Sequence, residues 1–106
     1  MRYFETRFGG GVGLEEVRLE PYQEALWSSA FGVETLDVLF DQQTPARAIA
    51  TLDAAIGKFN HDPDSLRHLL SPGDHRGLVG NRRVLEQMRE TLANHPDASI
   101  SGVIER

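Results

Sequence analysis

Apolar and polar residues alternate in two short segments near the start of the chain. Residues 2–8 have two phenylalanines on one side and a glutamate and an arginine on the other. Residues 14–20 alternate in the same way, with Val17 and Leu19 on the apolar side. This alternation is typical of strands with one buried face, so we predict two strands here. Residues 9–13 are mostly glycine, which accepts the positive φ of tight turns, and we therefore predict that the two strands form a hairpin.

The next apolar residues recur every three to four positions, which predicts helices. The first helix begins at Pro21, whose φ suits a first helical turn, and ends at Gly32, which accepts a left-handed conformation. The second follows the capping pair Thr44-Pro45. Its apolar positions have helical spacing: Ile49, Leu52, Ile56 and Phe59.

Two further helices are predicted before the last strand. Asp62-Pro63 repeats the capping pattern ahead of a short helix, which ends at Ser71-Pro72-Gly73. A longer helix then runs to His95-Pro96, with Asp74 or Asn81 as its N-cap.

Two more stretches are predicted to be strands. Residues 33–40 place three apolar residues on one side, and residues 98–104 alternate again. The predicted order is β-β-α-β-α-α-α-β. It indicates the α+β class, with a small mixed sheet of about four strands and helices mainly on one face, in a single domain covering residues 1–106.

The composition is typical of one folded domain. A chain of 106 residues, 40% hydrophobic and 25% charged, is long enough for one core. It has no cysteine, which excludes disulfides, a thiolate nucleophile and zinc held by cysteine. No apolar run is long enough to cross a bilayer, and charges occupy the start, where a signal peptide would be apolar. We therefore expect a cytoplasmic protein that does not bind membranes.

The net charge of −5 belongs to the first part of the chain. Between residues 15 and 41, seven acidic side chains occur with a single basic one, Arg18. We call these seven residues the acidic stretch: Glu15, Glu16, Glu20, Glu24, Glu34, Asp37 and Asp41. A surface of this charge repels the phosphates of nucleic acid and attracts basic proteins. The competing interpretation is a solvated outer face, which most soluble proteins carry.

The glycine cluster raises the question of a phosphate cradle. A dinucleotide-binding fingerprint needs glycine at the sixth position of G-x-G-x-x-G, between a strand and a helix. Here that position holds Leu14 or Glu16, depending on the register, and no P-loop lysine follows. The neighbouring glutamates would also repel phosphate. We therefore favour a hairpin loop and expect no nucleotide cofactor.

The histidines and a Ser-Asp-His run are weaker candidates for chemistry. His61, His68 and His75 are seven residues apart, but two prolines interrupt any helix that would align them. Residues 71–75 include serine, aspartate and histidine, yet the members of a catalytic triad normally come from separate elements. No G-x-S-x-G motif is present either. We predict neither a metal site nor a catalytic nucleophile.

A basic cluster near the start of the last long helix is a candidate anion site. It comprises His75, Arg76, Arg82 and Arg83. If Asn81 caps that helix, the two arginines after it lie at the positive end of the helix dipole, where a bound anion would offset their repulsion. The competing interpretation is internal pairing, such as Arg82 with Glu86 one turn further on.

Three functions are compatible with these patterns. The first is a noncatalytic acidic module that engages and inhibits a basic protein, such as a toxin or a nuclease, as an immunity protein or an antitoxin does. This analogy is functional and rests on no motif. The second is a small enzyme that acts on an anionic small molecule, with His75 as acid or base. The third is a homodimeric regulatory domain joined through a sheet edge or the helix that bears Trp27. Small size, missing catalytic motifs and skewed charge favour the first.

Overall fold

The two alternating segments at the start of the chain form the predicted hairpin in the computed structural model, which describes residues 1–9 and 11–106. Strand β1 (Arg2–Phe8) pairs antiparallel with β2 (Gly13–Leu19). The Phe8 amide donates to the Val12 carbonyl at 2.9 Å, and Gly11 turns the chain with a φ of 89°. Gly10, the centre of the predicted glycine loop, lies outside the described residues.

The predicted C-terminal strand is present but interrupted. Strands β3 (Ala98–Ile100) and β4 (Ile104–Glu105) both pair antiparallel with β1, on the side opposite β2. Tyr3 pairs with Ile104 of β4, and Thr6 pairs with Ile100 of β3. The two residues of β1 in between therefore lie opposite the three residues that join β3 to β4, which makes a bulge. The Ser101 amide donates to the Glu5 carbonyl at 2.8 Å, and the Ser101 hydroxyl accepts from the Glu5 amide at 3.0 Å. These bonds keep the bulged strand attached to the sheet.

The predicted helices are confirmed, with adjusted bounds. They are a 3-10 turn η1 (Pro21–Gln23) followed by α1 (Glu24–Phe31), then α2 (Pro45–His61), α3 (Asp64–Arg67) and α4 (Gly77–Asn94). Gly32 ends α1 in the left-handed conformation, with a φ of 70°. The Thr44 hydroxyl accepts the Arg47 amide at 3.2 Å and caps α2. None of the described helices is long and apolar enough to cross a membrane.

The strand predicted over residues 33–40 is wrong. Residues Leu36–Val38 form a 3-10 turn, η2, and the segment around it is irregular. Leu36 and Phe40 are buried while Val38 is 64% exposed, so the apolar residues do not share one face of a strand. The observed order is β-β-α-α-α-α-β-β, and the sheet is entirely antiparallel rather than mixed. The α+β class and the number of strands are nevertheless as predicted.

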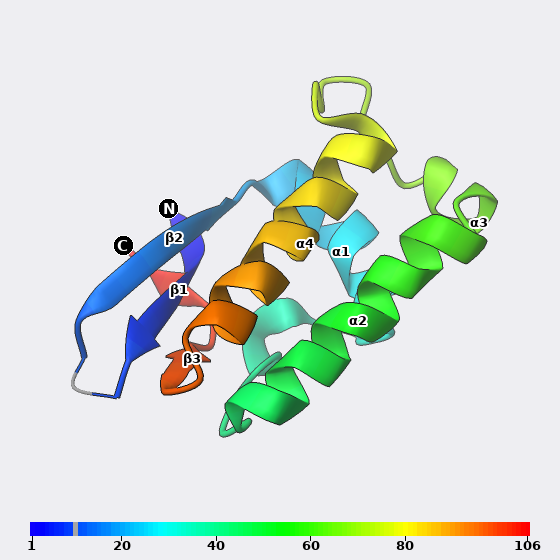
Figure 1. Cartoon of the computed structure of the whole chain (residues 1–106). Coiled ribbons are helices and arrows are strands. Elements are labelled where there is room, and N and C mark those ends of the chain that lie inside the picture. The colour runs from blue at the N-terminus through cyan, green and yellow to red at the C-terminus, as the bar shows by residue number, and fades with distance from the viewer. Residues whose placement is uncertain (10) are drawn as a thin grey trace.

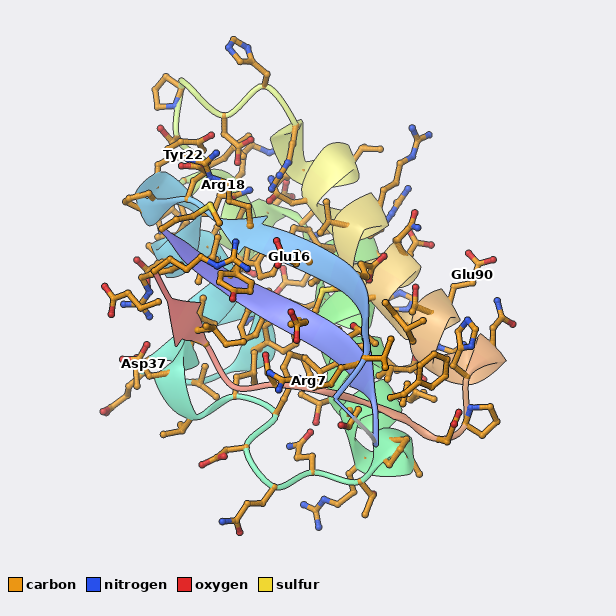
Figure 2. The ribbon with its side chains drawn as sticks, turned by 90° about the vertical axis from the view of Figure 1, so that its left-hand side faces the viewer. Arg7, Glu16, Arg18, Tyr22, Asp37 and Glu90 are labelled. Carbon is orange, nitrogen blue, oxygen red and sulfur yellow. The ribbon has the colours of Figure 1, made fainter. Side chains whose placement is uncertain are left out.

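The helices lie on one face of the sheet, as expected, and the core fills the space between (Figure 1). Phe4 of β1 meets the ring of Phe40 edge-on at 5.5 Å, and Phe40 meets Phe31 of α1 in the same way at 5.7 Å. The other face of the sheet is open and carries charged side chains, among them Arg7, Glu16 and Arg18 (Figure 2).

A buried polar network joins α1 to the start of α4. The Asn81 side-chain oxygen accepts from Trp27 Nε1 at 2.9 Å and from Gln23 Nε2 at 3.3 Å. Its amide nitrogen donates to Asp74 Oδ2 at 3.0 Å and to the Gly77 carbonyl at 2.8 Å. Asn81, Gln23 and Trp27 are fully buried, so all four hydrogen-bonding positions of the amide are satisfied inside the protein.

We expect Asn81→Ala to lower the free energy of unfolding by about 3 kcal/mol, because it leaves the Trp27 indole N–H and the Oδ2 atom of Asp74 without their hydrogen-bond partner. Urea denaturation followed by the fluorescence of Trp27, the only tryptophan, measures this change. The matched control is Asn94→Ala at the exposed end of α4, with an expected change within about 0.5 kcal/mol. Equal effects of the two substitutions would contradict a structural role for the network.

Candidate functional site

The acidic stretch does not form one continuous patch. Glu15 lies on the same side of β2 as Val17 and Leu19, which face the helices, whereas Glu16 stands over the open face of the sheet (Figure 2). Asp37 comes from η2, at the edge of the sheet (Figure 2). The seven carboxylates are therefore distributed over two faces of the sheet and the neighbouring segment.

Four of the seven acids form ion pairs with arginines. Glu16 lies 2.8 Å from Arg106, Glu20 lies 2.7 Å from Arg18, Glu24 lies 3.2 Å from Arg2, and Asp37 also contacts Arg2. Two of these three arginines come from the ends of the chain, far in sequence from the acids. Counting charges within residues 15–41 includes only one arginine, Arg18. That count therefore overstated the unpaired negative charge of this region.

The remaining negative charge is concentrated in residues 33–43, which we call the acidic loop. Glu34 and Asp41 are exposed and form no ion pair among the described residues. Asp37 shares Arg2 with Glu24, so one guanidinium faces two carboxylates. Within the described part of the chain, the four carboxylates of Glu24 and the acidic loop thus face one guanidinium group, that of Arg2, and the net charge of this group of side chains is about −3.

The acidic loop is held in place by its apolar residues. Leu36, Leu39 and Phe40 are buried, and the Thr51 hydroxyl donates to the Gln43 side chain at 3.1 Å. Phe40 has a φ of 67° and Gln42 a φ of 55°, a left-handed conformation that costs free energy in residues other than glycine. This anchoring presents Val38 and the carboxylates outward. Sequence reasoning missed Val38, because the strand pattern placed it on the buried face.

The pKa of Glu15 is raised above its ordinary value of 4.5. Burial between β2 and α4 is the main cause, and hydrogen bonds from the Thr91 and Gln87 side chains oppose it. Oxygen Oε1 of Glu15 is buried and has no hydrogen-bond partner in the described part of the chain.

Glu15 lies on β2, which is an edge strand of the sheet. An inward-facing charge on an edge strand disfavours pairing of that edge with another strand.

We expect Glu15→Gln to stabilise the protein at neutral pH. The folded protein holds the Glu15 proton more tightly than the unfolded chain, so this group contributes stability below pH 4.5 that is lost as pH rises through the raised pKa. The gain on substitution is small, because Glu15 is only half-buried, and it should shrink as the pH falls towards 4.5. Thermal unfolding across this pH range measures it. Glu16→Gln, one residue further on and exposed, is the control, and a matching gain in that variant would contradict the prediction.

The basic cluster that was a candidate anion site is divided by the fold. Helix α4 begins at Gly77, not after Asn81, so Arg82 and Arg83 lie in its second turn, away from the positive end of the dipole. Asn81 is inside the helix, and Asp74 accepts the Arg76 amide at 3.0 Å. Of the two N-caps that the sequence left open, neither Asn81 nor Asp74 occupies the N-cap position, which is Arg76, and the dipole argument that depended on Asn81 therefore does not hold.

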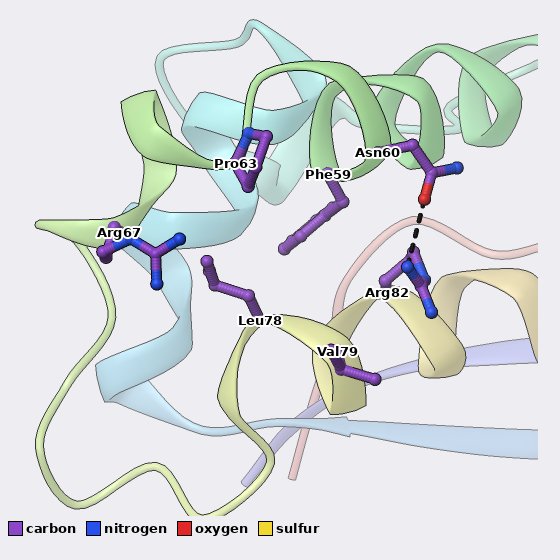
Figure 3. A pocket seen from close by; sticks show the side chains of 7 residues that line it. All are labelled: Phe59, Asn60, Pro63, Arg67, Leu78, Val79 and Arg82. Carbon is purple, nitrogen blue, oxygen red and sulfur yellow. Dashed lines mark hydrogen bonds between the residues drawn. The ribbon is translucent and has the colours of Figure 1, made fainter.

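A pocket of about 320 Å³ lies beside Arg82, between the end of α2, α3 and the start of α4 (Figure 3). Its lining residues are Phe59, Asn60, Pro63, Arg67, Leu78, Val79 and Arg82. Arg82 is paired with Glu86 at 3.0 Å, as the competing interpretation expected. His75, Arg76 and Arg83 are exposed and do not line this pocket.

Four of the residues that line the pocket with Arg82 come from α2, α3 and the turn between them, which the sequence pattern did not connect with α4. The Arg82–Asn60 hydrogen bond and the Arg89–Asp53 ion pair show that α2 and α4 run antiparallel. Two long helices that are joined by a compact connection usually pack antiparallel. This signal in the sequence would have predicted that the end of α2 lies beside the start of α4.

A second pocket of about 390 Å³ lies where β1 begins and β2 ends. Its charged lining side chains are Arg2, Arg18, Glu20 and Glu105, two of each sign.

The other candidates for chemistry do not assemble into a site. The glycine loop joins two strands, not a strand and a helix, so the structural context of a dinucleotide cradle is missing. In residues 1–9 and 11–106, no three His, Cys, Asp or Glu side chains are grouped so as to hold a metal ion. His95 packs its ring edge-on against Phe8 at 5.5 Å.

Comparisons of this chain with protein-family models, with curated proteins and with solved structures found no match.

Proposed function

We propose that this protein is a noncatalytic binding module that engages, and by binding inhibits, a basic protein partner through the acidic loop and Glu24. The partner chemistry we favour is a protein with a positively charged working surface, such as a nuclease or another toxin. The observation that supports this most directly is the charge excess that remains on the acidic loop after the ion pairs with Arg2, Arg18 and Arg106 are formed.

The acidic loop exposes one large apolar side chain next to its carboxylates. Val38, 64% exposed, stands beside the exposed carboxylate of Asp37. An apolar side chain surrounded by charged residues is the usual arrangement of an interface, in which the apolar centre supplies affinity and the charged rim supplies orientation and encounter rate. The buried Leu36, Leu39 and Phe40 reduce the ordering cost of binding, because they hold the loop in place before the partner arrives.

The proposed interface contains four of the seven residues of the acidic stretch. It excludes Glu15, Glu16 and Glu20. Glu15 faces the helices and is half-buried, and Glu16 and Glu20 are paired with Arg106 and Arg18. Exposed pairs of this kind contribute little to stability, yet they cancel the long-range field that attracts a basic partner.

The charge of the acidic loop can be tested with the double substitution Glu34→Lys/Asp41→Lys, which breaks no ion pair of the described residues. Proteins from the native host are captured on the wild-type chain alone, and the basic proteins that it retains are then purified and their binding to both chains is measured directly. We expect the double substitution to lower the association rate at low salt by at least about tenfold, and the wild-type rate to fall steeply with added salt.

The matched control is Glu90→Lys/Asp97→Lys, which makes the same change in net charge at two exposed acids outside the loop. We expect this variant to keep most of the association rate. Equal losses in both variants would show that net charge, not the acidic loop, governs association, and unchanged binding by the loop variant would refute the proposal.

Val38→Ser tests the apolar centre of the interface. Because Val38 is largely exposed, the thermal midpoint of unfolding should stay within a few degrees of the wild type. We expect dissociation of the same partner to become several-fold faster, with little change in the association rate. A wild-type dissociation rate would exclude Val38 from the interface.

A further inference from the structure

The pocket beside Arg82 combines an apolar base with two guanidinium groups. Phe59 of α2 is almost fully buried at its base, and Pro63 and Leu78 stand around it (Figure 3). Arg67 and Arg82 come from α3 and α4, on either side of these apolar side chains (Figure 3). The described residues that line the pocket include two arginines, and the carboxylates paired with them, Asp64 and Glu86, are not among the lining residues, so an anion inside the pocket meets guanidinium donors and no carboxylate of the lining.

Arg82 is oriented before any ligand arrives. Its Nη1 donates to Asn60 Oδ1 at 3.1 Å, and its Nε donates to Glu86 Oε1 at 3.0 Å. A guanidinium group has five N–H donors, and these two bonds use two of them. The bonds to α2 and to the next turn of α4 thus fix the plane of the guanidinium while leaving donors for a further acceptor.

Arg67 is free to change its partner. Its only ion pair in the described part of the chain is with Asp64, at 3.3 Å, and both side chains are well exposed. Exposed pairs three residues apart on a helix are weak, so a ligand carboxylate can replace Asp64 at little cost.

We propose that this pocket binds a small monocarboxylate with a compact apolar body, about the size of a benzene ring. The volume of about 320 Å³ is at the lower end of the range for small-molecule sites. The apolar body packs on Phe59, Pro63 and Leu78, and the carboxylate bonds to one of the two guanidinium groups, whose planar fork matches its two oxygens, while the other adds positive charge across the pocket. This site shares no residue with the acidic loop, so it does not depend on the function proposed for that loop.

Benzoate is the probe, added to the full 106-residue chain and followed by NMR through the backbone amides of Asn60, Leu78 and Val79. We expect saturable shifts at these three amides. Benzyl alcohol, which has the same ring without the charge, and acetate, which has the charge without the ring, should each bind at least roughly tenfold more weakly. Equal binding of either compound, or the absence of saturable shifts, would overturn the proposal.

Three substitutions of equal charge change locate the site. Arg82→Gln and Arg67→Gln, on different helices, should each weaken benzoate binding, by roughly tenfold for the arginine that bonds to the carboxylate and by a smaller factor for the other. Arg83→Gln, next to Arg82 but outside the pocket, should change the affinity by less than about twofold. Thermal unfolding of each variant confirms that it is folded, and Arg67→Gln leaves the Asn60 and Glu86 contacts of Arg82 intact. If Arg83→Gln lowered the affinity for benzoate as much as Arg82→Gln, the effect would come from the net charge of the protein, and the proposed site would be wrong.

Discussion

The structure depends on the hydrogen bonds of one buried side chain, Asn81. Trp27 supplies much of the core around α1, and its indole N–H must find an acceptor when it is fully buried. Asn81 provides that acceptor from the second turn of α4, and its own amide is held by Asp74 and the Gly77 carbonyl. Because a half-satisfied buried network costs more than an apolar core, α1, the turn before α4 and α4 itself are held in one mutual arrangement. The first turns of α4 also lie beside the end of α2, where Arg82 donates to Asn60, and the pocket lies between these segments.

Ion pairing determines which part of the surface remains charged. Arg2 and Arg106 lie at opposite ends of the chain, but β1 and β4 are neighbours in the sheet, so both guanidiniums reach the acids of β2, α1 and η2. Arg106 also lies over the ring of Tyr3, at 4.5 Å from its centre. The negative field is consequently removed from the open face of the sheet and left on the acidic loop, where charge and an exposed apolar side chain coincide.

The acidic loop is also where local preference and tertiary packing conflict. Its β-branched and aromatic residues favour a strand, yet the chain adopts a 3-10 turn and two left-handed residues other than glycine. Burial of Leu36, Leu39 and Phe40 against α1 and the sheet offsets that strain, as the contacts of Phe40 with Phe4 and Phe31 show. A backbone that departs from its local preference and presents polar groups outward is a common property of binding loops.

The sequence by itself determined the elements whose signals are local: the hairpin, the capped helix α2, the glycine that ends α1, and hence the α+β class. Turn residues, caps and hydrophobic period act over a few residues, so they can be read without knowing the fold. Only the tertiary structure decided which acids stay unpaired, why Asn81 is buried and not a cap, and how Arg67 and Asn60 come to face Arg82. These properties depend on contacts between residues far apart in the chain, and no local pattern records which of the possible partners packing will bring together.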